Sequence, residues 1–191
     1  MLHFSLLILL PLVGYAIDED EDYCKRLREG TPGYEADAHL IEPGLWLGNV
    51  CALLDHVFLE ENDITHAINV AAEWSFLCEG RFSVNMRCFP LNDTTDQSID
   101  DVNFTLGVAS HMLTIWRRNN QTVLVHCNAG ISRSSAVVIM YMMTRDPTLQ
   151  YDAALKLVRK SRAMARPNHL FESLMNNKSE KKKRHRMRFS L

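Results

Sequence analysis

Apolar and polar positions along the chain change between two patterns. Short runs of aliphatic and β-branched residues, bounded by turn-forming residues, predict strands at 45–48, 65–70, 84–91 and 123–125. Longer stretches with helical spacing of apolar residues predict helices at 52–61, 102–118, 134–143, 151–160 and 169–175. Strands that alternate with helices indicate an α/β fold, with a mainly parallel central sheet flanked by helices on both faces.

The helix predicted at 102–118 has one apolar face. Its apolar residues recur every three or four positions, so they should pack against the sheet together. They are Phe104, Val108, Met112, Ile115 and Trp116.

A chain of 191 residues has room for one folded domain plus tails. An apolar leader occupies 1–16, an acidic linker 17–38, the folded domain 39–176 and a basic tail 177–191. The net charge of −2 gives the whole molecule no nucleic-acid signature. The basic tail fits a nuclear address, a contact with an anionic surface or a solvated run equally well.

The segment that follows the strand at 123–125 carries the clearest chemistry. Its sequence is HCNAGISR, from His126 to Arg133, and Gly130 lets the backbone bend there. A loop between a strand and a helix N-terminus presents unpaired amides, and the helix dipole favours an anion. The same surroundings favour a thiolate at Cys127, which is then a nucleophile for phosphorus. Arg133 can clamp two phosphate oxygens with its planar fork.

The loop therefore predicts a phosphate-binding site. Cys127 and Arg133 should contribute side chains, and the residues between them mainly backbone amides. Those residues are Asn128, Ala129, Gly130, Ile131 and Ser132.

The pattern His126-Cys127-x-x-Gly130-x-x-Arg133-Ser134 resembles the signature of cysteine-dependent protein phosphatases. The string HCNAGISRS resembles the dual-specificity phosphatases, especially the small atypical ones without a kinase-docking domain. The resemblance runs from about Ile41 to Met175 and includes IEPGLWLGN, ITHAINVA, FPLND and RPNHLFESL. It implies the compact α/β phosphatase fold. It also implies hydrolysis of phosphotyrosine and of phosphoserine or phosphothreonine through a phosphocysteine, with no metal and no cofactor.

The leaving oxygen of such a reaction needs a proton. Asp93 is the predicted general acid, because FPLND resembles the strand-then-acid pattern of the family. In the second step it would take a proton from the attacking water. Three other acids near it in the sequence compete for the role: Asp96, Asp100 and Asp101.

Three further residues have predicted supporting roles. Ser134 could donate a hydrogen bond to the sulfur and help it leave, and it also fits the start of a helix. His126 is expected to organise the loop by hydrogen bonding rather than to transfer protons. Asn168, in RPNHLF, matches the family and is expected to be structural rather than a substrate contact.

The five cysteines, at 24, 51, 78, 88 and 127, show no paired spacing and no metal-site pattern. An odd count with one reactive thiol favours a reducing compartment. Cys88 is expected to be a plain buried thiol, with a reversible disulfide to Cys127 as the alternative.

Two signals in the sequence oppose each other on location. The leader is apolar from Leu2 to Val13 and ends in a small-residue cleavage pattern, although it lacks a positive n-region. It is shorter than the ~20 residues of a spanning helix, so no stable membrane span is expected. Four glycosylation sequons begin at Asn92, Asn103, Asn120 and Asn177, and a glycan on Asn92 would crowd Asp93. We therefore expect an active enzyme in the cytosol or nucleus, with the secretory pathway as the alternative.

Phosphorylated proteins are the expected partners, and the resemblance extends this to kinases of stress or mitogen cascades. Nucleic acid is not expected as a partner. RNA 5′-phosphates and phosphoinositides are alternative substrates, but the uncharged residues Asn128, Ala129, Ile131 and Ser132 argue against both. A phosphate-binding scaffold or pseudophosphatase is the non-enzyme alternative. It would be favoured by loss of the nucleophile, the arginine or the acid, and all three are present.

Overall fold

The computed structural model describes residues 21–79 and 82–188, and its centre is a five-stranded sheet of order β1-β2-β5-β3-β4. Strands β2, β5, β3 and β4 are parallel, and β1 pairs antiparallel with β2. This confirms the predicted mainly parallel α/β sheet. The strand bounds are β1 Ala38–Glu42, β2 Leu45–Gly48, β3 His66–Ala71, β4 Asn85–Leu91 and β5 Val123–His126.

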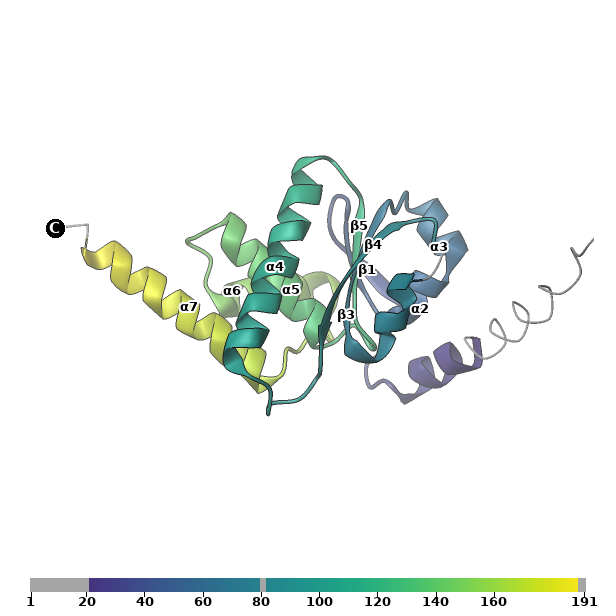
Figure 1. Cartoon of the computed structure of the whole chain (residues 1–191), viewed down its shortest axis with the longest axis horizontal. Coiled ribbons are helices and arrows are strands. Elements are labelled where there is room, and N and C mark those ends of the chain that lie inside the picture. The colour runs from purple at the N-terminus through teal and green to yellow at the C-terminus, as the bar shows by residue number, and fades with distance from the viewer. Residues whose placement is uncertain (1–20, 80–81, 189–191) are drawn as a thin grey trace, which may run out of the picture.

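Helices cover both faces of the sheet, as predicted (Figure 1). One layer contains α4 (Ile99–Arg118), α5 (Arg133–Arg145), α6 (Tyr151–Ser161) and α7 (His169–Arg188). The other contains α2 (Val50–Leu54) and α3 (His56–Glu61). The sequence predicted one helix at 52–61. Asp55 instead has extended backbone, and its side chain accepts from the Phe58 amide to begin α3.

The apolar face predicted for α4 is only partly the buried one. Trp116 is buried and Met112 packs against the core, whereas Phe104 and Ile115 are 72% and 40% exposed. The helix carries two apolar stripes, and the sheet and α5 take the one that also contains alanine and serine, which allow closer packing. The buried residues are Val102, Leu106, Ala109, Ser110, Leu113 and Trp116.

The two ends of the described chain also differ from the prediction. Residues 21–30 are helical, where an open acidic linker was predicted. Helix α7 continues to Arg188, well past the predicted end at residue 175. The predicted leader, 1–16, lies outside the described residues. Among the helices that are described, none is both long and apolar enough to cross a membrane.

The strand order explains where a site can form. Strand β5 is central and completely buried, with β2 and β3 as its parallel neighbours. Parallel strands bring the residues that follow their carboxyl ends to one edge of the sheet. Three such residues are Glu73 after β3, Asp93 after β4 and Cys127 after β5.

Candidate active site

The loop from Cys127 to Ser132 joins β5 to α5 and is held from beneath. Gly130 has a φ of +68°, and a Cβ there would lie 2.6 Å from the Gly48 backbone. The Arg162 side chain, fully buried, donates to the carbonyls of Gly130 at 2.6 Å and Ala129 at 3.1 Å. With these carbonyls turned inward, the loop amides can face an anion at the N-terminus of α5.

Cys127 lies at the base of the loop and is 1% exposed. Its sulfur is 3.2 Å from Ser134 Oγ, so the hydroxyl can donate to a thiolate. This is the geometry that the predicted role of Ser134 needs.

The predicted role of His126 in organising the loop stays a prediction. Within the described residues, neither of its ring nitrogens has a hydrogen-bond partner of ordinary geometry. Complete burial lowers the pKa of His126 to about 4, against a smaller opposing effect of a hydrogen bond with the Cys127 backbone. The imidazole is therefore neutral near pH 7.

Arg133 has five N–H bonds, and three are used by the protein. Nη1 donates to Glu73 Oε2 at 2.5 Å and to the Leu91 carbonyl at 3.0 Å, and Nη2 donates to Glu73 Oε1 at 2.6 Å. Within the described chain, Nε has no hydrogen-bond partner. The Nε–H and the second Nη2 hydrogen lie on one edge of the planar guanidinium. That edge can donate two bonds to an oxyanion.

Arg133 and Glu73 stabilise each other's charged forms. Burial works to lower the pKa of Arg133, but hydrogen bonding to Glu73 raises it above its usual value. Burial likewise works to raise the pKa of Glu73, and the hydrogen bonds from Arg133 lower it on balance. Both groups are therefore charged near neutral pH. Glu73 fixes the plane of the guanidinium that faces the loop.

Asp93 faces the free edge of Arg133. Its Oδ1 accepts from Ser132 Oγ at 2.7 Å and from Asn168 Nδ2 at 2.8 Å. Its Oδ2 lies 3.7 Å from Arg133 Nε. Asn168 also caps α7 by accepting from Leu170 and Phe171, so its structural role and its contact with the acid coexist.

A cavity of about 670 Å³ opens beside these groups, and its lining includes Glu73, Asp93 and Arg133. Asp96 also lines it, but a hydrogen bond from Thr94 lowers the pKa of Asp96, which disfavours its protonated form. Asp100 and Asp101 lie in the first turn of α4, where acids interact favourably with the helix dipole. The geometry therefore favours Asp93 over its three competitors.

The family model described as "Dual specificity phosphatase, catalytic domain" matches residues 45–180. The chain belongs to this family.

Individual relatives agree with this assignment. The chain is 34% identical over 132 residues to dual specificity protein phosphatase 22 of Mus musculus, with 69% of this chain and 68% of the relative covered. It is 35% identical over 126 residues to dual specificity protein phosphatase 15 of Mus musculus, with 66% and 51% covered. The crystal structure of DUSP15 superposes with a TM-score of 0.64 at 27% identity, covering 80% of this chain and 96% of that one.

Two residues near the loop of this dual-specificity phosphatase domain were missed in the sequence. Glu73 lies in η1 (Ala72–Glu79), a 3₁₀ helix where a loop was predicted, and its position directly after β3 was the available signal. Tyr23 donates to Asn128 Oδ1 across 105 positions of sequence, which no local pattern reveals. The Asn128 side chain is thus held by the protein, beyond the backbone role predicted for it.

The cysteine prediction is wrong for four of the five residues. Cys24 pairs with Cys51 and Cys78 with Cys88, with Cα–Cα distances of 5.7 and 6.2 Å that suit disulfides. Cys88 is therefore neither a plain thiol nor a partner of Cys127. The free cysteine is Cys127, which accounts for the odd count.

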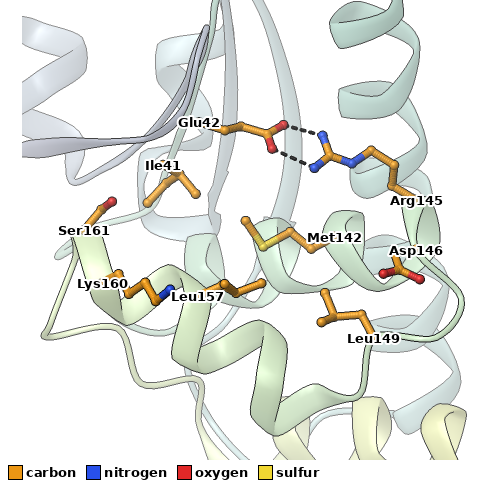
Figure 2. A pocket seen from close by; sticks show the side chains of 9 residues that line it. All are labelled: Ile41, Glu42, Met142, Arg145, Asp146, Leu149, Leu157, Lys160 and Ser161. Atoms are coloured by element: carbon orange, nitrogen blue, oxygen red, sulfur yellow. Dashed lines mark hydrogen bonds and ion pairs between the residues drawn. The ribbon is translucent and has the colours of Figure 1, made fainter.

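A second cavity, of about 350 Å³, lies between β1, α5 and α6 (Figure 2). Glu42 and Arg145 form a bidentate ion pair at its edge, with N–O distances of 2.6 and 2.7 Å. Its lining includes no residue of the loop from Cys127 to Arg133, whereas the cavity beside Asp93 includes Arg133. The candidate active site is therefore assigned to the cavity beside Asp93 and Arg133.

Proposed function

We propose that the protein is a dual-specificity protein phosphatase that hydrolyses phosphotyrosine and phosphoserine or phosphothreonine through a phosphocysteine. One observation carries this proposal. The free edge of Arg133 faces Asp93 Oδ2, 3.7 Å from Nε, and both residues line one cavity. Cys127 starts the loop that leads to Arg133, so the nucleophile, the oxyanion clamp and the acid belong to neighbouring segments at one edge of the sheet.

In the first step the thiolate of Cys127 attacks phosphorus while the loop amides and Arg133 bind the phosphoryl oxygens. The bond from phosphorus to the serine, threonine or tyrosine oxygen breaks. Asp93, protonated, gives its proton to that oxygen, so the leaving group departs as a neutral alcohol or phenol. The hydrogen bonds from Ser132 and Asn168 to Oδ1 keep the other carboxyl oxygen directed at the cavity.

In the second step the Asp93 carboxylate takes a proton from a water molecule, whose oxygen attacks phosphorus. The sulfur–phosphorus bond breaks, and the electron pair returns to Cys127 as a thiolate. Ser134 Oγ, 3.2 Å away, donates to this thiolate and makes it a better leaving group. Inorganic phosphate and the initial form of the acid are regenerated.

The test compares the wild type with Cys127→Ser on an aryl phosphate and on phosphorylated peptides. Turnover should fall more than about a hundredfold, because the covalent nucleophile is lost. Binding of tungstate, a phosphate mimic, should persist, since the amides and Arg133 remain. Equal tungstate binding with no wild-type turnover on any substrate would favour the phosphate-binding scaffold instead.

The substrate class within this function is also a proposal. Asn128, Ala129, Ile131 and Ser132 carry no charge, so the loop lacks the cations expected for RNA 5′-phosphates or phosphoinositides. We therefore favour phosphoproteins, with phosphorylated protein kinases among the first to assay. Faster release of phosphate from a 5′-triphosphorylated RNA than from phosphopeptides would reverse this choice.

The cellular location of the protein stays a prediction, and one reason for expecting the cytosol or nucleus no longer holds. A reducing location was expected because the cysteines looked unpaired, but two disulfides favour the secretory alternative. Asn120, in an exposed turn after α4, is a sequon at the opposite end of β5 from Cys127. The full chain should be expressed in cells and treated with a glycosidase. A mobility shift together with loss of residues 1–16 supports the secretory pathway. If the protein shows no mobility shift and keeps residues 1–16, the result supports the cytosol or nucleus.

A further inference from the structure

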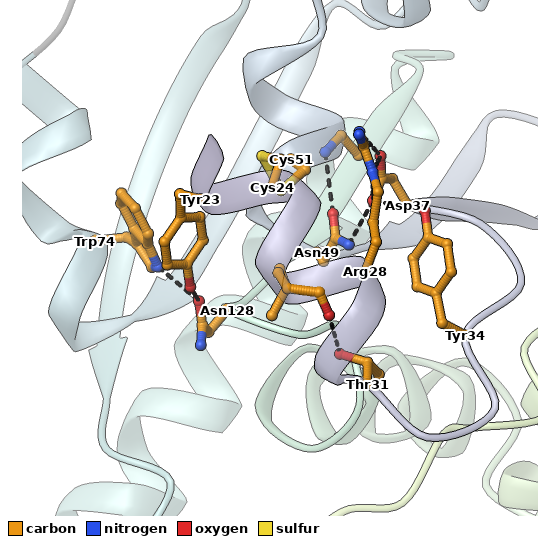
Figure 3. Close-up of a disulfide and its surroundings, with 12 residues drawn as sticks. Tyr23, Cys24, Arg28, Thr31, Tyr34, Asp37, Asn49, Cys51, Trp74 and Asn128 are labelled. Atoms are coloured by element: carbon orange, nitrogen blue, oxygen red, sulfur yellow. Dashed lines mark hydrogen bonds and ion pairs between the residues drawn. A yellow bond between two sulfur atoms is a disulfide. The ribbon is translucent and has the colours of Figure 1, made fainter. Parts of the chain in front are cut away.

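The helix at residues 21–30 lies before the region that matches the family, which begins at residue 45. It nevertheless lies against the phosphate loop. Figure 3 shows Tyr23 pointing from this helix toward Asn128, the residue after the nucleophile, with Trp74 of η1 beside it.

Two donors converge on one oxygen of the loop. Tyr23 Oη and Trp74 Nε1 both donate to Asn128 Oδ1, the latter at 2.9 Å (Figure 3). The two rings meet edge to face, with centroids 5.0 Å apart and planes at 72°. The Asn128 carbonyl in turn accepts from the Val50 amide at 3.1 Å. Both ends of Asn128 are therefore held, which limits the movement of the loop directly beside Cys127.

The helix that carries Tyr23 packs through a small apolar cluster. The cluster has three buried members, Cys24, Val50 and Cys51, and two of them form the disulfide. Tyr23 and Leu27 of the helix are only partly buried against it. Arg28 adds an ion pair to Asp37, which is partly exposed. A helix of this length is marginal in water unless tertiary contacts hold it. The disulfide is thus the principal attachment of the helix to α2.

We propose that Tyr23 is a positioning residue for the phosphate loop and that the Cys24–Cys51 disulfide keeps it in place. The inference rests on the proposed phosphatase function for its kinetic readout, though not for its binding readout. With the disulfide formed, Asn128 is fixed and the adjacent amides are preorganised for phosphate. With it broken, the helix detaches more often and the loop binds phosphate less tightly.

The disulfide can be reduced by a small thiol such as glutathione. The first thiolate attacks one sulfur and releases the other cysteine, and a second thiol then resolves the mixed disulfide. Cys24 and Cys51 each gain a proton and together accept two electrons, and two glutathiones become one oxidised glutathione. Cys24 and Cys51 are only 6% and 1% exposed, but both line a hollow of about 400 Å³, so a small thiol can approach the bond from this side when the helix moves away from α2.

The effect should fall on binding more than on chemistry. Tyr23 touches Asn128 and no reacting atom, so it supports amides that contact phosphate in the substrate and in the transition state alike. Uniform binding of this kind changes KM and leaves kcat nearly constant.

The experiment uses the full chain with Tyr23→Phe, the double variant Cys24→Ser/Cys51→Ser and the matched control Tyr34→Phe. Tyr34 donates to Asp37 at 2.9 Å, outside the phosphate loop. Tyr23→Phe and the double variant should each weaken tungstate binding and raise KM for an aryl phosphate by roughly threefold to tenfold. Their kcat should stay within about twofold of wild type, and Tyr34→Phe should match wild type.

A glutathione redox titration provides the second readout. Both proteins in this titration carry Cys127→Ser, so that the nucleophile cannot interfere. Reducing buffers should weaken tungstate binding when Cys24 and Cys51 are present, and should leave tungstate binding unchanged when both are replaced by serine. Unchanged tungstate affinity in Tyr23→Phe, or an equal loss in Tyr34→Phe, would overturn the proposal, even if the double variant fails to fold. If tungstate binding responds as expected and no variant turns over any phosphate, the positioning role stands and the proposed phosphatase function fails.

Discussion

The phosphate loop is held on two sides by very different means. Beneath it, Arg162 is completely buried and its guanidinium donates to two loop carbonyls from inside the family-matched region. Beside it, Tyr23 donates from a helix that lies outside that region and is attached mainly by one disulfide. The first support is a network of short, buried, charge-assisted bonds, and the second is a covalent tether that a change of redox conditions can remove. The Arg162 hydrogen bonds therefore hold the loop under all redox conditions, whereas the Tyr23 hydrogen bond depends on whether the disulfide is formed.

The largest expected effect is on the rate of hydrolysis when the general acid is removed. Asp93→Ala should slow hydrolysis of alkyl phosphates by roughly 10²–10⁴-fold, because the leaving oxygen loses its proton donor. The loss should shrink for an aryl phosphate whose leaving group needs no proton. Single-turnover rates on both substrates measure this.

Asp96→Ala is the matched control, since Asp96 lines the same cavity. A greater loss in Asp96→Ala than in Asp93→Ala would move the acid to Asp96. Ser132 and Asn168 would then no longer orient the proton donor.

The hydrogen bonds of Arg162 to the loop should contribute more to the stability of the protein than the hydrogen bond of Tyr23. Arg162→Met leaves the carbonyls of Gly130 and Ala129 without a donor in a buried site, which should lower the free energy of unfolding by about 3 kcal/mol. Urea denaturation measures it. Tyr23→Phe should lower it by about 1 kcal/mol or less. If the two variants lose similar stability, the contrast between the two sides is wrong.

A smaller effect is expected from the residue that orients the clamp. Glu73→Gln keeps a side-chain acceptor for Arg133 and removes the charge, so kcat/KM should fall by roughly tenfold. Glu79→Gln, an exposed residue at the end of the same 3₁₀ helix, is the control and should behave as wild type. No difference between the two variants would leave Leu91 as the group that fixes the guanidinium.

The phosphate loop and the central strands could be predicted from the sequence for a physical reason. Cys127, Arg133 and Ser134 lie within one strand–loop–helix unit, so their relative positions follow from local geometry. The strands are short apolar runs with few alternative structures, and β5 is buried as its composition predicts. Asp93 was chosen because FPLND resembles the strand-then-acid pattern of the family, and the structure places it two residues after β4.

The parts that were missed depend on contacts between distant segments. The pairing of Cys24 with Cys51 joins an acidic, polar segment to α2, and nothing local in that segment indicates burial. The exposed stripe of α4 has spacing as regular as the buried one, so periodicity alone could not choose between Phe104 and Leu106. The lack of side-chain hydrogen-bond partners of ordinary geometry at His126 could not be predicted, because it depends on what packs around a fully buried ring.

The cysteines are paired in the order in which they occur along the chain, Cys24 with Cys51 and Cys78 with Cys88. A ribosome delivers the chain from its N-terminus, at a pace that lets earlier segments fold first. Where disulfides form during synthesis, the two cysteines of each pair emerge before the cysteines that follow them. The nucleophile, Cys127, emerges last, when both partners of every other pair are already exposed to one another. Sequential emergence thus favours the observed pairs over pairs that would include the reactive thiol.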